Sequence, residues 1–319
     1  MIGRYFWVFI KGMMMGVADL VPGVSGGTIA FITEIYEELI DSISGLKPKK
    51  LKLLFSQGFA SFWKAINGSF LLAVFGGILV SVFSFSYVIG WLYENQQVGL
   101  FAFFLGLLLS SFFFMRRAVP SWDLAHYTTL IIGTIVAFGA TQLAPTTTTV
   151  SGTYLWLSGF IAISAMLLPG LSGSYILLVM GVYPLVLESL QVLVSMTTQF
   201  DQEQFMLHGG RLLILGTGII MGLLIFSGLL KWLLKRFKTY TLAALLGLML
   251  GACHKIWPWQ NELLYSLGNI TKKQTQAVWP SEFNGEPMLG IALLCFVLGI
   301  SLLFFLEKMR QNQSTHEHP

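Results

Sequence analysis

The sequence predicts an all-α polytopic membrane protein with two inverted-topology repeats, each a re-entrant or broken helix pair followed by three transmembrane helices. Three observations predict it: a scarcity of charge, long uncharged apolar segments and an internal repeat. Only 11% of the 319 residues are charged and 55% are hydrophobic, whereas a soluble domain carries about 25% charged residues. Too few charges remain for a water-facing surface, which excludes a cytosolic enzyme, a nucleic-acid-binding module and a secreted disulfide scaffold.

The first predicted element is a broken helix pair over residues 5–43. An apolar stretch leads to Asp19 and a Pro/Gly-rich break, and a half-polar helix follows. Irregular backbone at membrane depth is tolerated only where protein or a water-filled cavity satisfies its polar groups. We therefore expect this segment to lie inside the helix bundle.

The spans follow from gaps between charges. Uncharged stretches of 29, 21 and 20 residues follow Lys64, Glu94 and Glu286, and about 20 apolar residues suffice to cross the hydrocarbon. The 64 residues between Asp123 and Glu188 carry no formal charge and are divided by proline and glycine, which indicates a span and a second broken pair. The predicted spans lie near 69–92, 98–115, 128–144, 211–231, 240–256 and 288–306, and the second broken helix pair covers 153–195.

An internal repeat divides the chain into residues 1–145 and 146–319. The segment PGVSGGTI at Pro22–Ile29 recurs as PGLSGSYI at Pro169–Ile176, at an offset of 147. At an offset of 141, further pairs are Gly77 with Gly218, Trp91 with Trp232 and Gly106 with Gly247. Because three spans follow each broken pair, the second half enters from the opposite side. Inverted repeats with paired broken helices are typical of secondary transporters.

Basic residues predict the orientation. With the N-terminus in the cytoplasm, 14 of the 19 Lys and Arg residues fall on the cytoplasmic side and four outside, as the positive-inside rule requires. Both termini are then cytoplasmic, with an extracytoplasmic loop at 257–287 and a short cytoplasmic tail at 307–319.

The two Pro-Gly-x-Ser-Gly loops are the candidate binding site. A helix N-terminus offers free N–H groups and partial positive charge, which suits a phosphate- or carboxylate-sized anion. The alternative is that the glycines permit close helix crossing and the serines only cap helices. The candidate headgroup ligands are Ser25, Gly26, Gly27, Thr28, Ser172, Gly173, Ser174 and Arg211, and the residues expected to shape the loops are Pro22, Gly23, Pro169 and Gly170. Arg211 opens a span, where it either steers an anionic headgroup or snorkels to the interface.

Three charged residues are expected within the membrane, Asp19, Glu34 and Lys11. An ionisable group there indicates function by default, and Asp19 is the candidate to take up a coupling proton or sodium ion. Its alternative roles are a helix cap or a partner for Lys11. The counterpart of Asp19 in the second half is Met166, so the two halves are not chemically equivalent. No metal, other cofactor or catalytic residue is expected.

The segment GVADLVPGVSGGT at Gly16–Thr28, followed by IYE at Ile35–Glu37, resembles the bacterial polyprenyl-phosphate transporter family, PopT type. The resemblance extends to the length, the second loop and the repeat. It implies a flippase that returns undecaprenyl phosphate across the bacterial cytoplasmic (inner) membrane for reuse in cell-envelope synthesis, with Asp19 and the loop Pro22–Thr28 at the headgroup site. It implies a polyprenyl phosphate lipid and the bilayer as partners and no nucleic acid, and it leaves a homodimer open.

Two other functions stay open at this point. An ion-coupled transporter or channel for a small anion would use the same helix N-termini. A rhomboid-like intramembrane serine hydrolase would use the Gly-x-Ser-Gly at Gly23–Gly26 or at Gly170–Gly173. A nucleophilic serine needs a positioned base, and His254 is the membrane-embedded candidate, so the enzyme is the weaker alternative.

Overall fold

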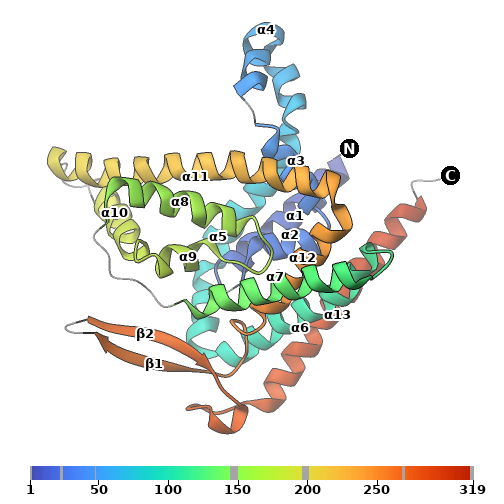
Figure 1. Cartoon of the computed structure of the whole chain (residues 1–319), viewed down its shortest axis with the longest axis vertical. Coiled ribbons are helices and arrows are strands. Elements are labelled where there is room, and N and C mark those ends of the chain that lie inside the picture. The colour runs from blue at the N-terminus through green and yellow to red at the C-terminus, as the bar shows by residue number, and fades with distance from the viewer. Residues whose placement is uncertain are drawn as a thin grey trace. The chain divides into compact units, whose positions relative to one another are not determined.

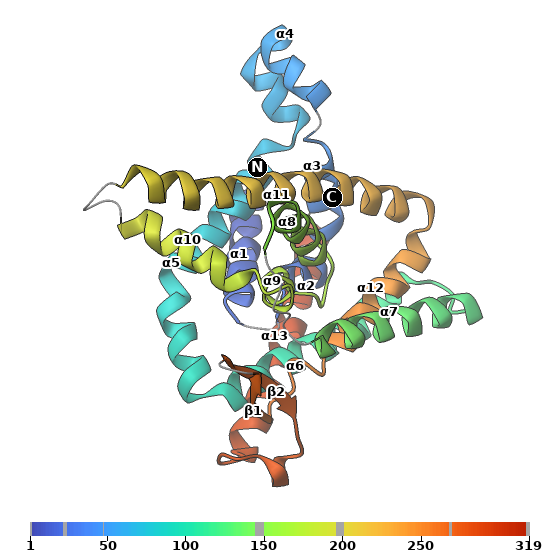
Figure 2. The same ribbon diagram turned by 60° about the vertical axis from the view of Figure 1, so that its left-hand side comes forward.

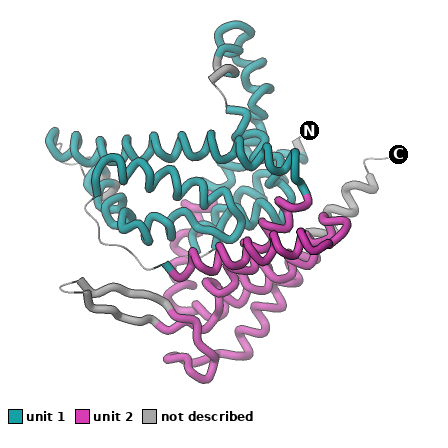
Figure 3. Tube along the Cα trace, in the orientation of Figure 1, with its two compact units in different colours: residues 1–79, 143–238 teal, residues 80–142, 239–319 magenta. Residues whose placement is uncertain are grey.

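The computed structural model describes residues 2–21, 24–46, 48–143, 150–195, 201–267 and 270–316. These residues form α-helices, short 3-10 turns and a β-hairpin (Figure 1). The chain divides into two compact units, residues 1–79 with 143–238 and residues 80–142 with 239–319 (Figure 3). Each unit therefore takes elements from both halves of the sequence. The division of the chain at residue 145 stays a prediction.

Unit 1 contains both broken helix pairs. Its elements from the first half are α1 (Ile2–Asp19), α2 (Gly26–Ile32), α3 (Tyr36–Ser44), α4 (Pro48–Ala65) and the start of α5 (Gly68–Asn95). Its elements from the second half are α8 (Gly152–Met166), α9 (Gly173–Val179), α10 (Tyr183–Ser195) and α11 (Gln202–Arg236). Helix α11 runs alongside α8 and α10 (Figure 1).

Each predicted broken helix pair is a set of three helices in the structure. A long helix, α1 or α8, is followed by a non-helical connection and two shorter helices. Gly170 has a φ of 88°, in the left-handed region that favours glycine, and it turns the chain after α8. Ser25 and Ser172 adopt extended backbone and cap α2 and α9 with their hydroxyl groups. Pro22 and Gly23, which were expected to shape the first loop, lie outside the described residues.

Helix α4 is an element that the charge pattern did not predict. It is interrupted at Gly58, whose φ is 82° and ψ is 171°, and it extends away from the other helices of unit 1 in both views (Figures 1 and 2). The part of α4 after Gly58 is hydrogen-bonded to the start of α5, because the indole nitrogen of Trp63 donates to Ser69 Oγ at 3.0 Å.

Unit 2 contains the remaining helices and the β-hairpin. Its elements are the end of α5, α6 (Gln97–Met115), η1 (Arg116–Ala118), α7 (Leu124–Gln142), α12 (Lys238–Ala252), β1 (Gln260–Leu267), β2 (Ile270–Ala277), η2 (Pro280–Glu282) and α13 (Leu289–His316). Strands β1 and β2 pair antiparallel, from Gln260 opposite Ala277 to Leu267 opposite Ile270. The predicted loop 257–287 therefore carries regular structure that the sequence pattern did not reveal.

The apolar helices confirm the all-α polytopic membrane class. The helices long and apolar enough to cross a membrane are Gly68–Asn95, Gln97–Ala118, Leu124–Gln142 and Gln202–Arg236, and shorter apolar helices cover Gly152–Met166, Lys238–Ala252 and Leu289–Phe305. Every predicted span overlaps one of these helices. Large side chains such as Leu72, Phe83 and Ile135 are exposed, which is stable where lipid, not water, surrounds the helix.

The two sequence halves make equivalent helix contacts in unit 1. At each contact a glycine faces a backbone carbonyl so closely that an added methyl group would overlap the oxygen. The contacts are Gly12 with Val74 and Gly77 with Phe9 in the first half, and Gly159 with Leu215 and Gly218 with Trp156 in the second. These residues correspond to one another at the offsets of 147 and 141 that the sequence repeat predicts.

Unit 2 extends this correspondence to the last helix of each half. The glycine contacts are Gly106 with Phe296 and Gly299 with Phe103 between α6 and α13, and Gly247 with Leu130 and Gly133 with Ala244 between α7 and α12. They match α6 with α12 at an offset of 141 and α7 with α13 at an offset of 166. The second offset changes because the β-hairpin precedes α13. The opposite direction of the two halves across a membrane stays a prediction.

Candidate functional site

The first loop is closed by a carboxylate. Asp19 is the last residue of α1, and its Oδ1 accepts a hydrogen bond from the backbone N–H of Gly26 at 2.6 Å. Ser25 Oγ accepts from the N–H of Gly27 at 3.2 Å. These two side chains satisfy N–H groups that the first turn of a helix cannot satisfy internally. The anion at the start of α2 in this conformation is therefore the protein's own carboxylate.

The second loop has no carboxylate at the equivalent position. Met166 stands where the first loop has Asp19, and a methyl group added to Gly173 would lie 3.2 Å from Met166 Cβ. Ser172 Oγ caps α9 through the N–H of Tyr175 at 3.5 Å and lies 2.9 Å from Ser174 Oγ. Ser174 is exposed and Ser172 half-buried, so this loop presents a pair of hydroxyl groups.

The two loops contact each other directly. The backbone N–H of Gly170 donates to Thr28 Oγ1 at 2.8 Å, across 142 residues of sequence. The hydroxyl of Tyr36 donates to the carbonyl oxygen of Leu167 at 2.7 Å. A methyl group at Gly27 would lie 2.8 Å from the carbonyl oxygen of Met166. The repeated motifs thus form one buried contact in which the start of α2 packs against the chain after α8.

Lys11 and Asp19 bind opposite ends of α2. Lys11 Nζ donates to the carbonyl oxygen of Thr33, which caps the C-terminus of α2, at 2.8 Å. Asp19 binds the N-terminus of the same helix, so both charges have the sign that the helix dipole favours. Glu34 follows directly and has a positive φ of 61°. Asp19 therefore acts as a helix cap in this structure, and Lys11 binds the opposite end of α2 through Thr33.

Arg211 is not joined to the loops by hydrogen bonds. It is half-buried on α11, and among the described residues it forms no hydrogen bond or ion pair with either loop. Its proposed contact with a headgroup stays a prediction.

A buried polar pair near Arg211 was missed by the sequence analysis. His208 Nδ1 lies 3.1 Å from Ser189 Oγ, and its Nε2 lies 3.1 Å from Gln204 Oε1. The first half has the equivalent contact, Asn67 Nδ2 donating to Ser42 Oγ at 3.2 Å. The offset of 141 pairs Asn67 with His208, so the repeat itself could have revealed this contact.

Among the described residues, no base is positioned to activate either loop serine. Ser25 and Ser172 cap helices, and no histidine forms a hydrogen bond with either of them in the part of the chain that the structure describes. His208 is hydrogen-bonded to Ser189. The geometry gives no support to a serine hydrolase at these loops.

Exposed apolar helices and broken helices whose loops meet define a polytopic α-helical membrane protein of the transporter class. The chain belongs to the undecaprenyl phosphate translocase-like family, whose sequence model matches residues 15–274. The resemblance carried by the opening motif is thereby confirmed.

Two relatives are similar along most of their length. A Vibrio cholerae serotype O1 protein named polyprenyl-phosphate transporter is 40% identical over 312 residues, covering 96% of this chain and 97% of that protein. A Staphylococcus aureus protein of the same name is 30% identical over 268 residues, covering 80% of this chain and 87% of that protein. No solved structure matches the chain.

Proposed function

We propose that this protein returns undecaprenyl phosphate from the outer to the inner leaflet of the bacterial cytoplasmic membrane, where the lipid carrier is reused in cell-envelope synthesis. Family membership and two relatives named polyprenyl-phosphate transporter support the proposal. The structural observation that carries it is the Gly170–Thr28 hydrogen bond between the two loops. Paired broken helices are where secondary transporters hold their substrates.

The proposal assigns the first contact with the headgroup to the second loop. The hydroxyl groups of Ser172 and Ser174 share a hydrogen bond at 2.9 Å, in which one hydroxyl donates to the other. A phosphate oxygen can accept from the second hydroxyl directly, and from the first when its hydrogen turns away from its partner. The N–H of Gly26 is bound by Asp19, so a phosphate must displace that carboxylate to reach the first loop. Gly27, Gly173 and Thr28 then complete the proposed headgroup site.

The same competition supports a role for Asp19 in coupling. A protonated carboxyl group accepts a hydrogen bond more weakly than a carboxylate does. Proton uptake by Asp19 would therefore release the N–H of Gly26 for the phosphate, and sodium binding to the carboxylate would have the same effect. Neither ion would be a bound cofactor, because each would cross the membrane down its own gradient.

The proposed orientation places both termini in the cytoplasm. Fourteen of the 19 basic residues then lie on the cytoplasmic side, in agreement with the positive-inside rule. A cysteine introduced in place of Gly3 should react with a membrane-impermeant thiol reagent only after the cell membrane is permeabilised.

The oligomeric state is a separate question. Light scattering of the purified wild-type protein in detergent distinguishes a monomer from the homodimer.

The central experiment is transport in proteoliposomes. Labelled undecaprenyl phosphate is placed in one leaflet, and its appearance in the other is followed with and without proton and sodium gradients. We expect transport by the wild type and a reduced rate for S172A/S174A. The matched control is S164A, because among the described residues the Ser164 hydroxyl bonds its own helix, at Phe160 O. A wild type that moves free phosphate but not the lipid would favour a small-anion transporter instead.

A further inference from the structure

A hollow lies in unit 2, where α6 ends and α7 begins. Its volume is about 560 Å³. Its lining combines two basic side chains, two interfacial aromatic side chains and several apolar ones, among them Arg116, Arg117, Trp122, Tyr127, Phe112 and Leu130. Such a lining suits an amphiphile with an anionic end.

The two arginines are held in place without being neutralised. The Arg116 guanidinium lies 5.5 Å from the ring centre of Phe113, and that of Arg117 lies 5.3 Å from the ring centre of Phe114. These are cation–π distances, and the indole nitrogen of Trp122 donates to the Arg116 carbonyl oxygen at 3.3 Å. Within the described ranges, neither arginine forms an ion pair. The hollow therefore keeps two positive charges.

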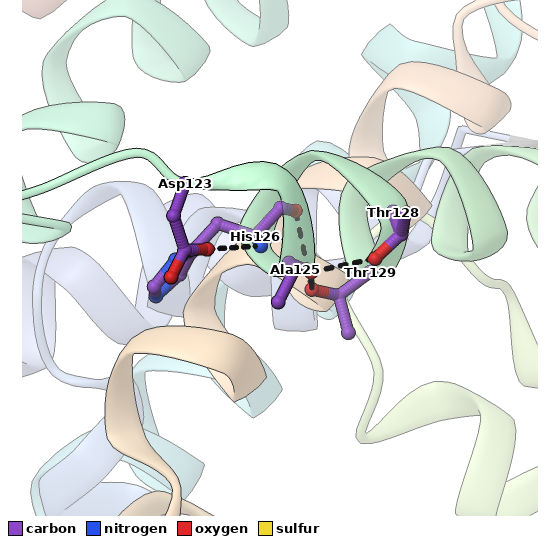
Figure 4. Close-up of polar contacts among 5 residues, drawn as sticks. All are labelled: Asp123, Ala125, His126, Thr128 and Thr129. Carbon is purple, nitrogen blue, oxygen red and sulfur yellow. Dashed lines mark hydrogen bonds and ion pairs between the residues drawn. The ribbon is translucent and has the colours of Figure 1, made fainter.

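The single carboxylate of the connection between α6 and α7 is engaged elsewhere. Asp123 Oδ1 accepts from the backbone N–H of His126 at 2.9 Å and lies 2.6 Å from its Nδ1 (Figure 4). The ring of His126 in turn stacks on Tyr240, with ring centres 4.3 Å apart. Asp123 thus caps α7 and binds a histidine on its own helix. It does not neutralise the arginines.

We propose that this hollow is a second docking position for the phosphate headgroup of the transported lipid, separate from the two loops; this rests on the proposed function. A phosphate monoester carries a charge of roughly −1.5 to −2 at pH 7, which two arginines balance. Guanidinium groups bind phosphate oxygens in pairs, which a lysine cannot do. Phe112 and Leu130 offer apolar surface to the start of the prenyl chain.

The position along the chain gives this site its role. Arg116 and Arg117 directly follow α6 and lie at the C-terminal end of the candidate span Gln97–Ala118, on the side that the basic residues assign to the cytoplasm. Trp122 and Tyr127 are residue types that favour the headgroup level of a bilayer. The hollow therefore holds the headgroup after it has crossed, at the level where inner-leaflet phosphates lie.

The test is lipid binding to the purified full-length protein by native mass spectrometry. The probes are undecaprenyl phosphate, undecaprenol, which lacks the phosphate, and inorganic phosphate. We expect R116Q/R117Q to bind undecaprenyl phosphate about tenfold more weakly at one of two positions, because charge-assisted hydrogen bonds are lost. The matched control is K231Q/K238Q, which removes two basic charges that are already paired with Asp41 and Glu37.

The outcomes separate this inference from the proposed function. A wild type that neither binds nor moves undecaprenyl phosphate overturns both. If the wild type moves the lipid, and R116Q/R117Q binds as many lipid molecules with the same affinity, the second docking position alone is overturned. Displacement of the lipid by millimolar inorganic phosphate would assign the hollow to free phosphate and likewise overturn it. If R116Q/R117Q unfolds, R116K/R117K keeps the charge, and its weakened binding supports paired guanidinium contacts.

Discussion

The first and second loops share the Pro-Gly-x-Ser-Gly pattern but differ in their surroundings. Ser25 and Thr28 of the first loop are 1% and 3% exposed, whereas Ser174 of the second loop is exposed. The equivalent positions that differ include Asp19 against Met166, Gly27 against Ser174 and Thr28 against Tyr175. A repeated motif thus gives one loop that is closed by its own carboxylate and one that presents hydroxyl groups.

The largest expected effect comes from exchanging residues between the loops. G27S gives the first loop the residue of the second, and its Cβ would lie 2.8 Å from a backbone oxygen, so we expect destabilisation of about 1–3 kcal/mol. S174G makes the opposite exchange at an exposed position and should cost less than about 1 kcal/mol. Unfolding of both variants in the same detergent measures the difference. Equal destabilisation would show that the two loops are packed alike.

Asp19 provides the second test of the difference. D19L leaves the buried N–H of Gly26 without its acceptor, which should cost about 2 kcal/mol. D19N keeps an acceptor oxygen and should fold, bind lipid and lose the dependence of transport on an ion gradient. The control M166L changes the equivalent residue of the second half and should leave both readouts near the wild type. A D19N variant with unchanged gradient dependence would remove Asp19 from coupling.

The contact between the loops should show a smaller effect. T28V keeps the shape of the side chain but deprives the N–H of Gly170 of its acceptor, at a cost of about 1.5 kcal/mol. The equivalent change in the second loop, Y175F, removes a hydrogen bond to Leu143 O at 3.1 Å and should cost about 0.5 kcal/mol. Chemical denaturation of the two variants provides the comparison, and the reverse order would contradict the assigned burial.

The smallest effect is expected at Asp123, a carboxylate outside both loops that serves as a comparison for Asp19. The backbone N–H and then the side chain of His126 lower the pKa of Asp123. A lowered folded-state pKa stabilises the protein above the ordinary Asp pKa of about 3.9, and this stability is lost as the pH falls through the lowered value. In D123N, the unfolding temperature should therefore depend slightly less on pH below about pH 4 than in the wild type. An unchanged acid slope would show that Asp123 contributes nothing.

Much of the architecture could be predicted from charge and repetition. Charged residues are expensive in lipid, so their absence marks the spans directly, and the repeat identified the loops before any contact was known. Helix α4 was missed because its lysines interrupt the apolar pattern. The match between α7 and α13 was missed because the β-hairpin shifts the offset and because few identical pairs, such as Gly133 with Gly299, preserve the signal.

The site was predicted in its residues but not in its bonding. The sequence indicated that a charged Asp19 is costly to place in the membrane, but it did not identify the group that Asp19 binds. The spacing of residues does not show which backbone N–H a carboxylate will reach. The sequence could not show that Thr28 accepts from Gly170, since that bond depends on how two distant segments pack. Arg211 was named for its charge and position alone, and no described contact joins it to the loops.

The bond from Gly170 to Thr28 also bears on the history of the gene. A homodimer of two second halves would present Tyr175 where the joined chain presents Thr28, and Met166 where it presents Asp19. Such a dimer would have neither the acceptor for the Gly170 N–H nor the carboxylate that closes the first loop. The second half therefore cannot replace the first at this contact.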